Sequence, residues 1–270
     1  MGAATVALLC SEARTEQPIF DEMPRWNDGW GVQVLAEYQR ARHLLDGSDV
    51  FAPDTPESAY ILRVEGVYTF TKAYRLTLKI PVVLDAQRTQ PVGPSRQLVS
   101  QTDQGLAAPV LTMPLKSYFN LDGRSGSWTL APQVSVRVGP QRDYTPIPQV
   151  WGAGLGVGYE TETYRYHFGT SLSGWWYEPG LYNQPSLLTW GIGGGLNVQA
   201  LGSSGHIKLK ANATVQTDSS VIVDVGPLVY WRLSDLWHAQ LLWRRDVFNS
   251  QGRVRPGDRD VFRVGLGVVF

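Results

Sequence analysis

The sequence has little charge, no net charge and a single cysteine. Lys and Arg number 24, Asp and Glu also number 24, and together they make up 18% of the 270 residues. This balance argues against a nucleic-acid-binding protein, which would carry a basic excess. One cysteine forms no intrachain disulfide and excludes a metal site built from a pair of thiolates.

Long apolar runs are also missing. No stretch of the chain reaches the roughly 18–20 apolar residues that a membrane-spanning helix needs, so the sequence excludes a helical membrane protein. A membrane β-barrel is not excluded, because alternation along its strands hides their hydrophobicity from a window average. The 28 Gly and the even spread of turn residues argue against a helical bundle.

The N-terminal residues resemble part of a targeting segment. Residues 1–10 are small and apolar, and Ser11-Glu12-Ala13 offers the small residues of a cleavage site. We interpret residues 1–13 as a partial secretory signal peptide, whose missing basic part would lie upstream of Met1. The alternative is a short apolar terminus without that role. We expect residues 14–29 to form a periplasmic segment that rests under the following domain or plugs it.

Alternation of apolar and polar residues dominates the chain from residue 30 onward. In one example, Leu76, Leu78 and Ile80 alternate with Thr77 and Lys79. Such a period of two indicates β-strands with one apolar face. We predict about twelve strands, at residues 30–42, 58–70, 74–87, 107–118, 128–138, 150–160, 164–177, 187–200, 206–216, 220–231, 236–246 and 260–270. The predicted fold is an all-β, up-and-down antiparallel transmembrane β-barrel over residues 30–270, with both termini periplasmic.

Loop lengths and aromatic residues favour a barrel in a membrane over a soluble β-sandwich. Most connections alternate between short turns and longer loops, as in outer-membrane barrels. Two fit less well, because 121–127 is long for a periplasmic turn and 218–219 is short for an outer loop. Aromatic residues favour the membrane interface, and they flank the short turns here: Tyr68, Phe70, Tyr74, Tyr118, Phe119, Trp128, Tyr159, Tyr164, Tyr166, Tyr230, Trp231 and Trp237.

The last strand, Asp260-Val-Phe-Arg-Val-Gly-Leu-Gly-Val-Val-Phe270, resembles the C-terminal strand of bacterial outer-membrane proteins. The resemblance implies a signal for the barrel-assembly machinery at Phe262, Val264, Leu266, Val268 and Phe270. It also implies a location in the outer membrane of a Gram-negative bacterium, with outer-membrane lipids as partners.

Other stretches resemble an outer-membrane family labelled as transporters or as meta-pathway phenol-degradation proteins. They are Asp28-Gly-Trp-Gly-Val-Gln-Val34, Glu65-Gly-Val-Tyr-Thr-Phe70, Lys116-Ser-Tyr-Phe-Asn-Leu-Asp-Gly123 and Gly158-Tyr-Glu-Thr-Glu162. The resemblance runs from about residue 21 to 270 and implies a barrel of this topology. It carries over no catalytic residue.

The strand phase points a predominantly basic set of side chains inward. A basic lining lowers the barrier for anions. The predicted pore-lining residues are Arg63, Glu65, Arg75, Lys79, Lys116, Arg137, Arg165, His167, Lys208, Lys210, Asp224, Arg244 and Arg263. The same phase points four further acids inward, namely Glu37, Asp85, Glu160 and Asp246.

Two features leave open whether such a lumen conducts. Inward glycines, such as those at 152, 154, 156 and 158, either widen a passage, relieve bending, or make room for Trp175 and Tyr177. Inward charges either line a pore or pair and close it, and Arg63, Glu65 and Arg75 are candidates for such a network.

Catalytic and metal chemistry have little support. None of the four histidines lies in a His-x-Ser pair, and only His167 shares a strand face with serines, at 171 and 173. We therefore predict a non-enzyme without metal or cofactor that passes small anionic or aromatic solutes passively. A non-conducting structural or binding barrel is the alternative, and an outer-membrane hydrolase a third, which would lose lipid hydrolysis on His167→Ala. We expect no nucleic-acid partner, and the sequence leaves the oligomeric state open.

The basic lining leads to a prediction about ion selectivity. Replacing Lys208 and Lys210 by Glu reverses the ion preference if both side chains line a pore. The measurement is the reversal potential across a planar bilayer in a salt gradient. Unchanged selectivity would remove both residues from the pore.

Overall fold

A computed structural model of the chain describes Met23 and residues 26–92, 97–121, 124–139, 145–147, 149–163, 165–178, 186–198, 205–216, 220–250 and 254–270. The expected signal peptide and most of segment 14–29 lie outside these residues, as do Tyr164 and the predicted turn 218–219. Within the described ranges, no helix is long and apolar enough to cross a membrane.

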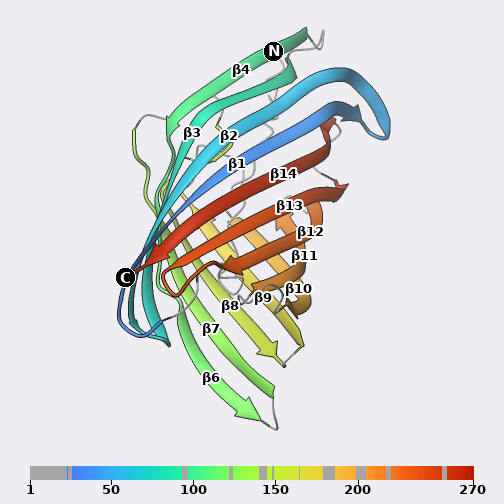
Figure 1. Cartoon of the computed structure of the whole chain (residues 1–270). Helices are drawn as coiled ribbons and strands as arrows, with labels where there is room; N and C mark the ends of the chain where they lie inside the picture. The colour runs from blue at the N-terminus through green and yellow to red at the C-terminus, as the bar shows by residue number, and fades with distance from the viewer. Residues whose placement is uncertain are drawn as a thin grey trace.

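The described residues fold into antiparallel strands that close into a barrel (Figure 1). The strands are β1 (Gly29–Asp46), β2 (Asp49–Thr71), β3 (Tyr74–Val92), β4 (Gln97–Leu106), β5 (Val110–Thr112), β6 (Leu115–Leu121), β7 (Arg124–Ser135), β8 (Gly152–Glu162), β9 (Tyr166–Tyr177), β10 (Ser186–Val198), β11 (Gly205–Gln216), β12 (Val221–Arg232), β13 (Trp237–Asn249) and β14 (Val254–Val269). In this part of the chain, β5 and its continuation β6 share one place in a ring of twelve, and β4 extends the β3 hairpin.

The predicted fold class is confirmed, but several strands run further than predicted. Predicted loop 43–57 is largely the β1–β2 hairpin, whose strands pair as far as Asp46 and Asp49. Predicted connection 121–127 is shorter, since β6 extends to Leu121 and β7 starts at Arg124. We call the end of the barrel with the β2–β3 and β12–β13 turns the turn end, and the opposite end the loop end.

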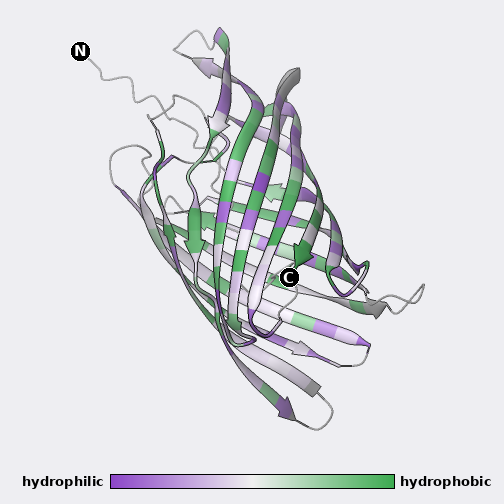
Figure 2. Cartoon of the chain, turned by 60° about the vertical axis from the view of Figure 1, so that its left-hand side comes forward, coloured by the Kyte–Doolittle hydropathy of each residue, from purple (hydrophilic) through white to green (hydrophobic). Residues whose placement is uncertain are grey.

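The two faces of the wall differ as the alternation predicts. Figure 2 shows hydrophobic and hydrophilic residues alternating along the strands. In β11, Leu209 points outward and is 62% exposed, whereas its neighbour Lys210 is buried on the inner face. Because apolar side chains cover the outer face, burying that face requires an apolar medium such as lipid.

Aromatic side chains gather at the turn end of the outer face. Trp30, Tyr68, Phe70 and Tyr74 form successive ring contacts, each with centroids 4.7 Å apart. Trp128 contacts Tyr159 at the same distance. Tyr230 differs from the prediction, because it is buried on the inner face and stacks on His206 and His238.

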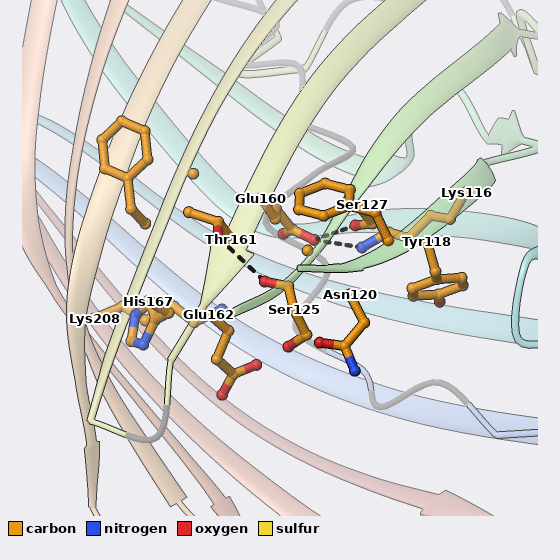
Figure 3. A pocket seen from close by; sticks show the side chains of 14 residues that line it. Lys116, Tyr118, Asn120, Ser125, Ser127, Glu160, Thr161, Glu162, His167 and Lys208 are labelled. Atoms are coloured by element: carbon orange, nitrogen blue, oxygen red, sulfur yellow. Dashed lines mark hydrogen bonds and ion pairs between the residues drawn. The ribbon is translucent and has the colours of Figure 1, made fainter. Parts of the chain in front are cut away.

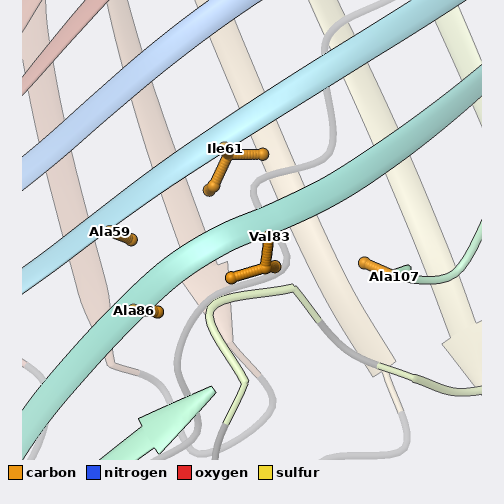
Figure 4. Close-up of a cluster of buried hydrophobic side chains, with 5 residues drawn as sticks. All are labelled: Ala59, Ile61, Val83, Ala86 and Ala107. Atoms are coloured by element: carbon orange, nitrogen blue, oxygen red, sulfur yellow. The ribbon is translucent and has the colours of Figure 1, made fainter. Parts of the chain in front are cut away.

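The inner face changes character along β2 and β3. Toward the loop end, Ala59 and Ile61 of β2 pack with Val83 and Ala86 of β3 and with Ala107, forming a small apolar patch (Figure 4). Ile147, from the segment between β7 and β8, packs against this patch. Nearby, the Gln149 amide donates to the Leu106 carbonyl over 2.6 Å. Ile147 and Gln149 of the β7–β8 segment therefore lie on the inner side of the barrel at the loop end.

The first and last strands complete the ring. Trp30 and Phe270 exchange both backbone hydrogen bonds, each 2.9 Å long. The ladder between β1 and β14 continues from Gly31 and Val269 to Asp46 and Val254. Of the expected assembly-signal residues, the structure exposes four on the outer face: Phe262, Val264, Leu266 and Phe270.

Gly226 permits an unusually close approach between two strands. A Cβ atom there would lie 1.9 Å from the Trp243 carbonyl oxygen and 2.8 Å from the Arg244 Cα atom. The β12–β13 ladder is interrupted beside it, between the pairs Val225–Arg245 and Leu228–Leu242. The obstacles are backbone atoms, so relief requires the two strands to separate.

We therefore expect Gly226→Ala to destabilise the barrel by about 1–3 kcal/mol, the usual cost of overpacking. The matched control is Gly66→Ala in β2, where an added Cβ meets nothing within 4 Å. Urea unfolding, followed by the heat-modifiable gel mobility of the folded barrel, measures both variants. Equal midpoints for the two would contradict the steric reading of Gly226.

Candidate functional site: the barrel lumen

A buried carboxylate lies at the junction of β14, β1 and β2. Glu37 accepts hydrogen bonds from Arg263 Nε at 2.8 Å and Nη2 at 2.6 Å, from Arg63 at 3.1 Å and from Gln39 at 2.7 Å. The side chain of Glu37 is 1% exposed and that of Arg263 3%. We call these four residues the Glu37 cluster. The hydrogen-bond donors around Glu37 offset the desolvation free energy of burying its carboxylate. Without such partners, burial of the ionised carboxylate would be strongly unfavourable.

A second network lies next to it toward the turn end. Glu65 accepts a hydrogen bond from Gln33 and lies 3.8 Å from Lys79 Nζ. The side-chain amide oxygen of Gln33, Oε1, in turn accepts a hydrogen bond from Gln240 at 3.0 Å and lies 3.3 Å from His238 Nε2. We call these five residues the Glu65 cluster. Gly267 makes room for it, since a Cβ there would lie 2.3 Å from the His238 ring.

The predicted closed network of Arg63, Glu65 and Arg75 has a different arrangement. Arg63 pairs with Glu37 instead of Glu65. Arg75 is buried and donates to the Met23 backbone carbonyl over 3.4 Å. The prediction placed all three side chains on the inner face, but strand register, which the sequence did not reveal, decided their partners.

Part of the N-terminal segment lies inside the barrel at the turn end. Met23 is buried. A Cβ atom at Gly31, on the inner face of β1, would lie 2.5 Å from the Trp26 ring and 3.3 Å from the Met23 sulfur. Together with the Arg75 contact, this places Met23 and Trp26 against the lumen face of β1 and β3.

The wall formed by β7, β8, β9 and β10 has a different inner face. Its inward positions are mostly small or uncharged, and buried: Ser127, Thr129, Ala131, Gly156, Gly158, Ser171, Ser173, Gly191 and Gly193. Toward the loop end, the rings of Trp175 and Tyr177 lie over Gly154 and Gly152. The third reading of these glycines, room for bulky partners, therefore applies at the two positions nearest the loop end.

A cavity of about 490 Å³ opens at the turn end of this wall (Figure 3). On one side of it, Lys116 Nζ lies 2.5 Å from Glu160, which also accepts from Ser127 at 3.5 Å. On the other side, Lys208 and His167 lie together. We call this space the turn-end pocket. Lys208 makes no hydrogen bond or ion pair with any described residue, unlike the paired Lys116.

A third charged group continues around the lumen on β11, β12 and β13. Asp224 accepts a hydrogen bond from Asn212 at 2.8 Å, and Arg244 Nη1 lies 3.7 Å from it. Lys210 and Asp246 are also buried on the inner face. The predicted excess of inward positive charge is thus largely balanced by acids.

Three predicted inward residues lie elsewhere. Arg137 follows the end of β7, is 37% exposed and lies 3.9 Å from Glu178. Arg165 is exposed in the turn before β9. Asp85 is exposed because a β-bulge opposite Tyr60 and Ile61 shifts the phase of β3. In each case the strict alternation assumed from the sequence ends before the residue.

Sequence reasoning also missed a row of four contacting rings across the inner face, in which His167 meets His206 edge-on and the other pairs stack. His167 and His206 have ring centroids 6.0 Å apart, His206 and Tyr230 5.3 Å, and Tyr230 and His238 5.7 Å. Each residue occupies an inward position of its strand. The signal in the sequence was the inward phase of these residues, but only the register brings the four rings to one level.

Comparison with known proteins finds similarity in structure alone. No family model matches the chain, and no curated protein matches it. An outer membrane channel from Pseudomonas putida F1 has a similar structure, with a TM-score of 0.67 and 13% sequence identity over 93% of this chain and 98% of that chain. The NanC porin has a TM-score of 0.51 and 7% identity over 88% and 98% of the two chains. At such identities the similarity shows a common barrel fold.

The Glu37 cluster generates a stability prediction. Glu37→Gln leaves Arg63 and Arg263 buried without their carboxylate, so we expect a loss of about 3–5 kcal/mol in the free energy of unfolding. Asp235→Asn is the control, because the Arg232–Asp235 pair at 2.8 Å is exposed and such pairs contribute little. Equilibrium urea unfolding in lipid vesicles compares the two. A Glu37→Gln barrel as stable as the control would contradict the assigned role of the cluster.

Proposed function

We propose that this protein is a passive diffusion channel for small solutes in the outer membrane of a Gram-negative bacterium. The observation that carries the proposal is the division of the lumen wall. Long charged side chains from β14, β1, β2 and β3 pair with one another, whereas the inner face of β7–β10 is largely glycine, serine and threonine. Small side chains leave the volume that a solute needs, in a barrel size between filled and channel-forming ones.

Other features support this proposal. The apolar outer face and the aromatic residues at the turn end suit a lipid environment. The similar barrel from Pseudomonas putida F1 is an outer membrane channel. Passage would follow the concentration gradient, with no cofactor, metal or energy coupling.

A closed barrel is the second candidate, and one specific observation favours it. Met23 and Trp26 lie against the lumen face of β1 and β3, and Arg75 donates to the Met23 carbonyl. This contact reduces the open cross-section at the turn end. In the channel proposal, Met23 and Trp26 therefore leave this face when the passage opens.

An outer-membrane hydrolase has less support. His167 and Ser171 share the inner face of β9 but stand four residues apart, which is about 13 Å along a strand. Ser173 stands further away. A serine nucleophile and its histidine base need hydrogen-bond contact, so these residues form no catalytic pair.

Single-channel recording of the refolded full chain in a planar bilayer tests the proposal. We expect discrete conductance steps, and longer or more frequent open states in Trp26→Ala, because the smaller side chain weakens packing of the segment against Gly31. Trp176→Ala, on the exposed outer face of β9, is the control for loss of a tryptophan. A folded barrel that stays silent in both the original and the Trp26→Ala form would favour the closed barrel.

A further inference from the structure

We infer that the turn-end pocket is a binding site for small carboxylates, through which solutes leave the lumen. The inference rests on the proposed channel for its role in passage, although binding itself is measured without conduction. The pocket lies at the mouth of the barrel, between β6, β7, β8, β9 and β11.

The lining has no net formal charge, with Lys116 and Lys208 balancing Glu160 and Glu162, but only one of the two lysines is ion-paired to a described residue. Lys116 and Glu160 form a pair at 2.5 Å. Glu162 and His167 stand directly opposite each other on β8 and β9. Lys208 is the remaining charged side chain of the lining, and no described residue forms a hydrogen bond or ion pair with it. A cation in a walled cleft attracts an anion more strongly than one on an open surface.

The pairing of β10 with β11 positions Lys208 at the pocket. Lys208 of β11 pairs with Gly195 of β10, and Gly195 pairs in turn with His167 of β9. A Cβ atom at Gly195 would lie 2.1 Å from the Ile207 carbonyl oxygen and 2.8 Å from the Lys208 Cα atom. The glycine thus lets β10 and β11 approach closely and leaves no side chain between Lys208 and His167.

The rest of the lining suits an organic anion more than an inorganic one. Tyr118, which pairs with the inward Ser127, supplies apolar ring surface, and Asn120 and Ser125 supply neutral hydrogen-bonding groups. In Figure 3, Asn120 and Ser125 lie below the Lys116–Glu160 pair, and Lys208 and His167 lie to the left of them. A volume of about 490 Å³ accommodates a ring-sized molecule. An aryl carboxylate places its charge at Lys208 and its ring toward Tyr118.

Binding of 4-fluorobenzoate to the refolded full chain in detergent, followed by fluorine NMR, tests this site. 4-Fluorobenzyl alcohol, with the same ring and no carboxylate, is the control ligand. We expect Lys208→Met to weaken 4-fluorobenzoate binding about tenfold or more, as for loss of a charge-assisted hydrogen bond, and to leave the alcohol unchanged. Glu162→Gln should strengthen 4-fluorobenzoate binding about two- to fivefold, because a nearby negative charge is removed.

Lys72→Met is the matched control variant. Lys72 carries the same charge at the turn end, in the β2–β3 turn outside the pocket. Its replacement should leave binding unchanged, and Lys208→Arg should retain most of it. Heat-modifiable gel mobility verifies that each barrel is folded.

Several results would overturn the site. They are absence of saturable 4-fluorobenzoate binding, equal weakening by Lys72→Met and Lys208→Met, or an equal effect of Lys208→Met on the alcohol. Conductance distinguishes this failure from that of the channel. A silent barrel that binds 4-fluorobenzoate through Lys208 keeps the site and loses the channel, whereas a conducting barrel without binding does the reverse.

Discussion

Burying ionised side chains inside a narrow barrel is the constraint on which much of this structure depends. Glu37 meets it with donors from three neighbouring strands, β14, β1 and β2. These strands join the two ends of the chain, so the same contacts that neutralise the carboxylate also hold the seam of the ring. The Glu65 cluster continues the arrangement from β13 to β3. Because each partner comes from a different strand, one shifted strand would leave several charges unpaired.

The lumen is consequently built from two unlike halves. In one half, the inward side chains of the Glu37 and Glu65 clusters form ion pairs and hydrogen bonds with one another. In the other half, from β7 to β10, most inward side chains are small and uncharged. In a barrel of intermediate diameter, the size of the inward side chains decides how much of the lumen is filled. The inward fold of Ile147 and Gln149 at the loop end and of Met23 at the turn end shows that both ends narrow this space.

Much of the fold could be predicted from the sequence, because alternation with a period of two is a property of each strand alone. It correctly indicated a closed antiparallel barrel, and it assigned Arg75, Lys210 and Arg263 to the face that the structure buries. Pairing could not be predicted in the same way. Arg263 meets Glu37 across 226 residues of chain, and this contact depends on a register that no local pattern encodes. The role of Arg75, Lys210 and Arg263 as pore-lining residues stays a prediction.

The misplaced residues show where local reasoning fails. Asp85 follows a bulge, which adds a residue and turns the alternation over. Arg137 and Arg165 lie beyond the ends of their strands, where alternation no longer applies. The Lys208 environment depends on Gly195 of the next strand. Sequence alone identified Lys208 as inward but gave no reason to distinguish it from Lys210.

The hydrogen bonds between Trp30 and Phe270 have a consequence for biogenesis. The last strand in chain order, β14, pairs with β1, so the ring of described strands stays open until β14 has been made. Until then the nascent chain presents two open edges, each a template for pairing with another chain. Pairing of β14 with β1 removes both edges and with them this route to association with other copies.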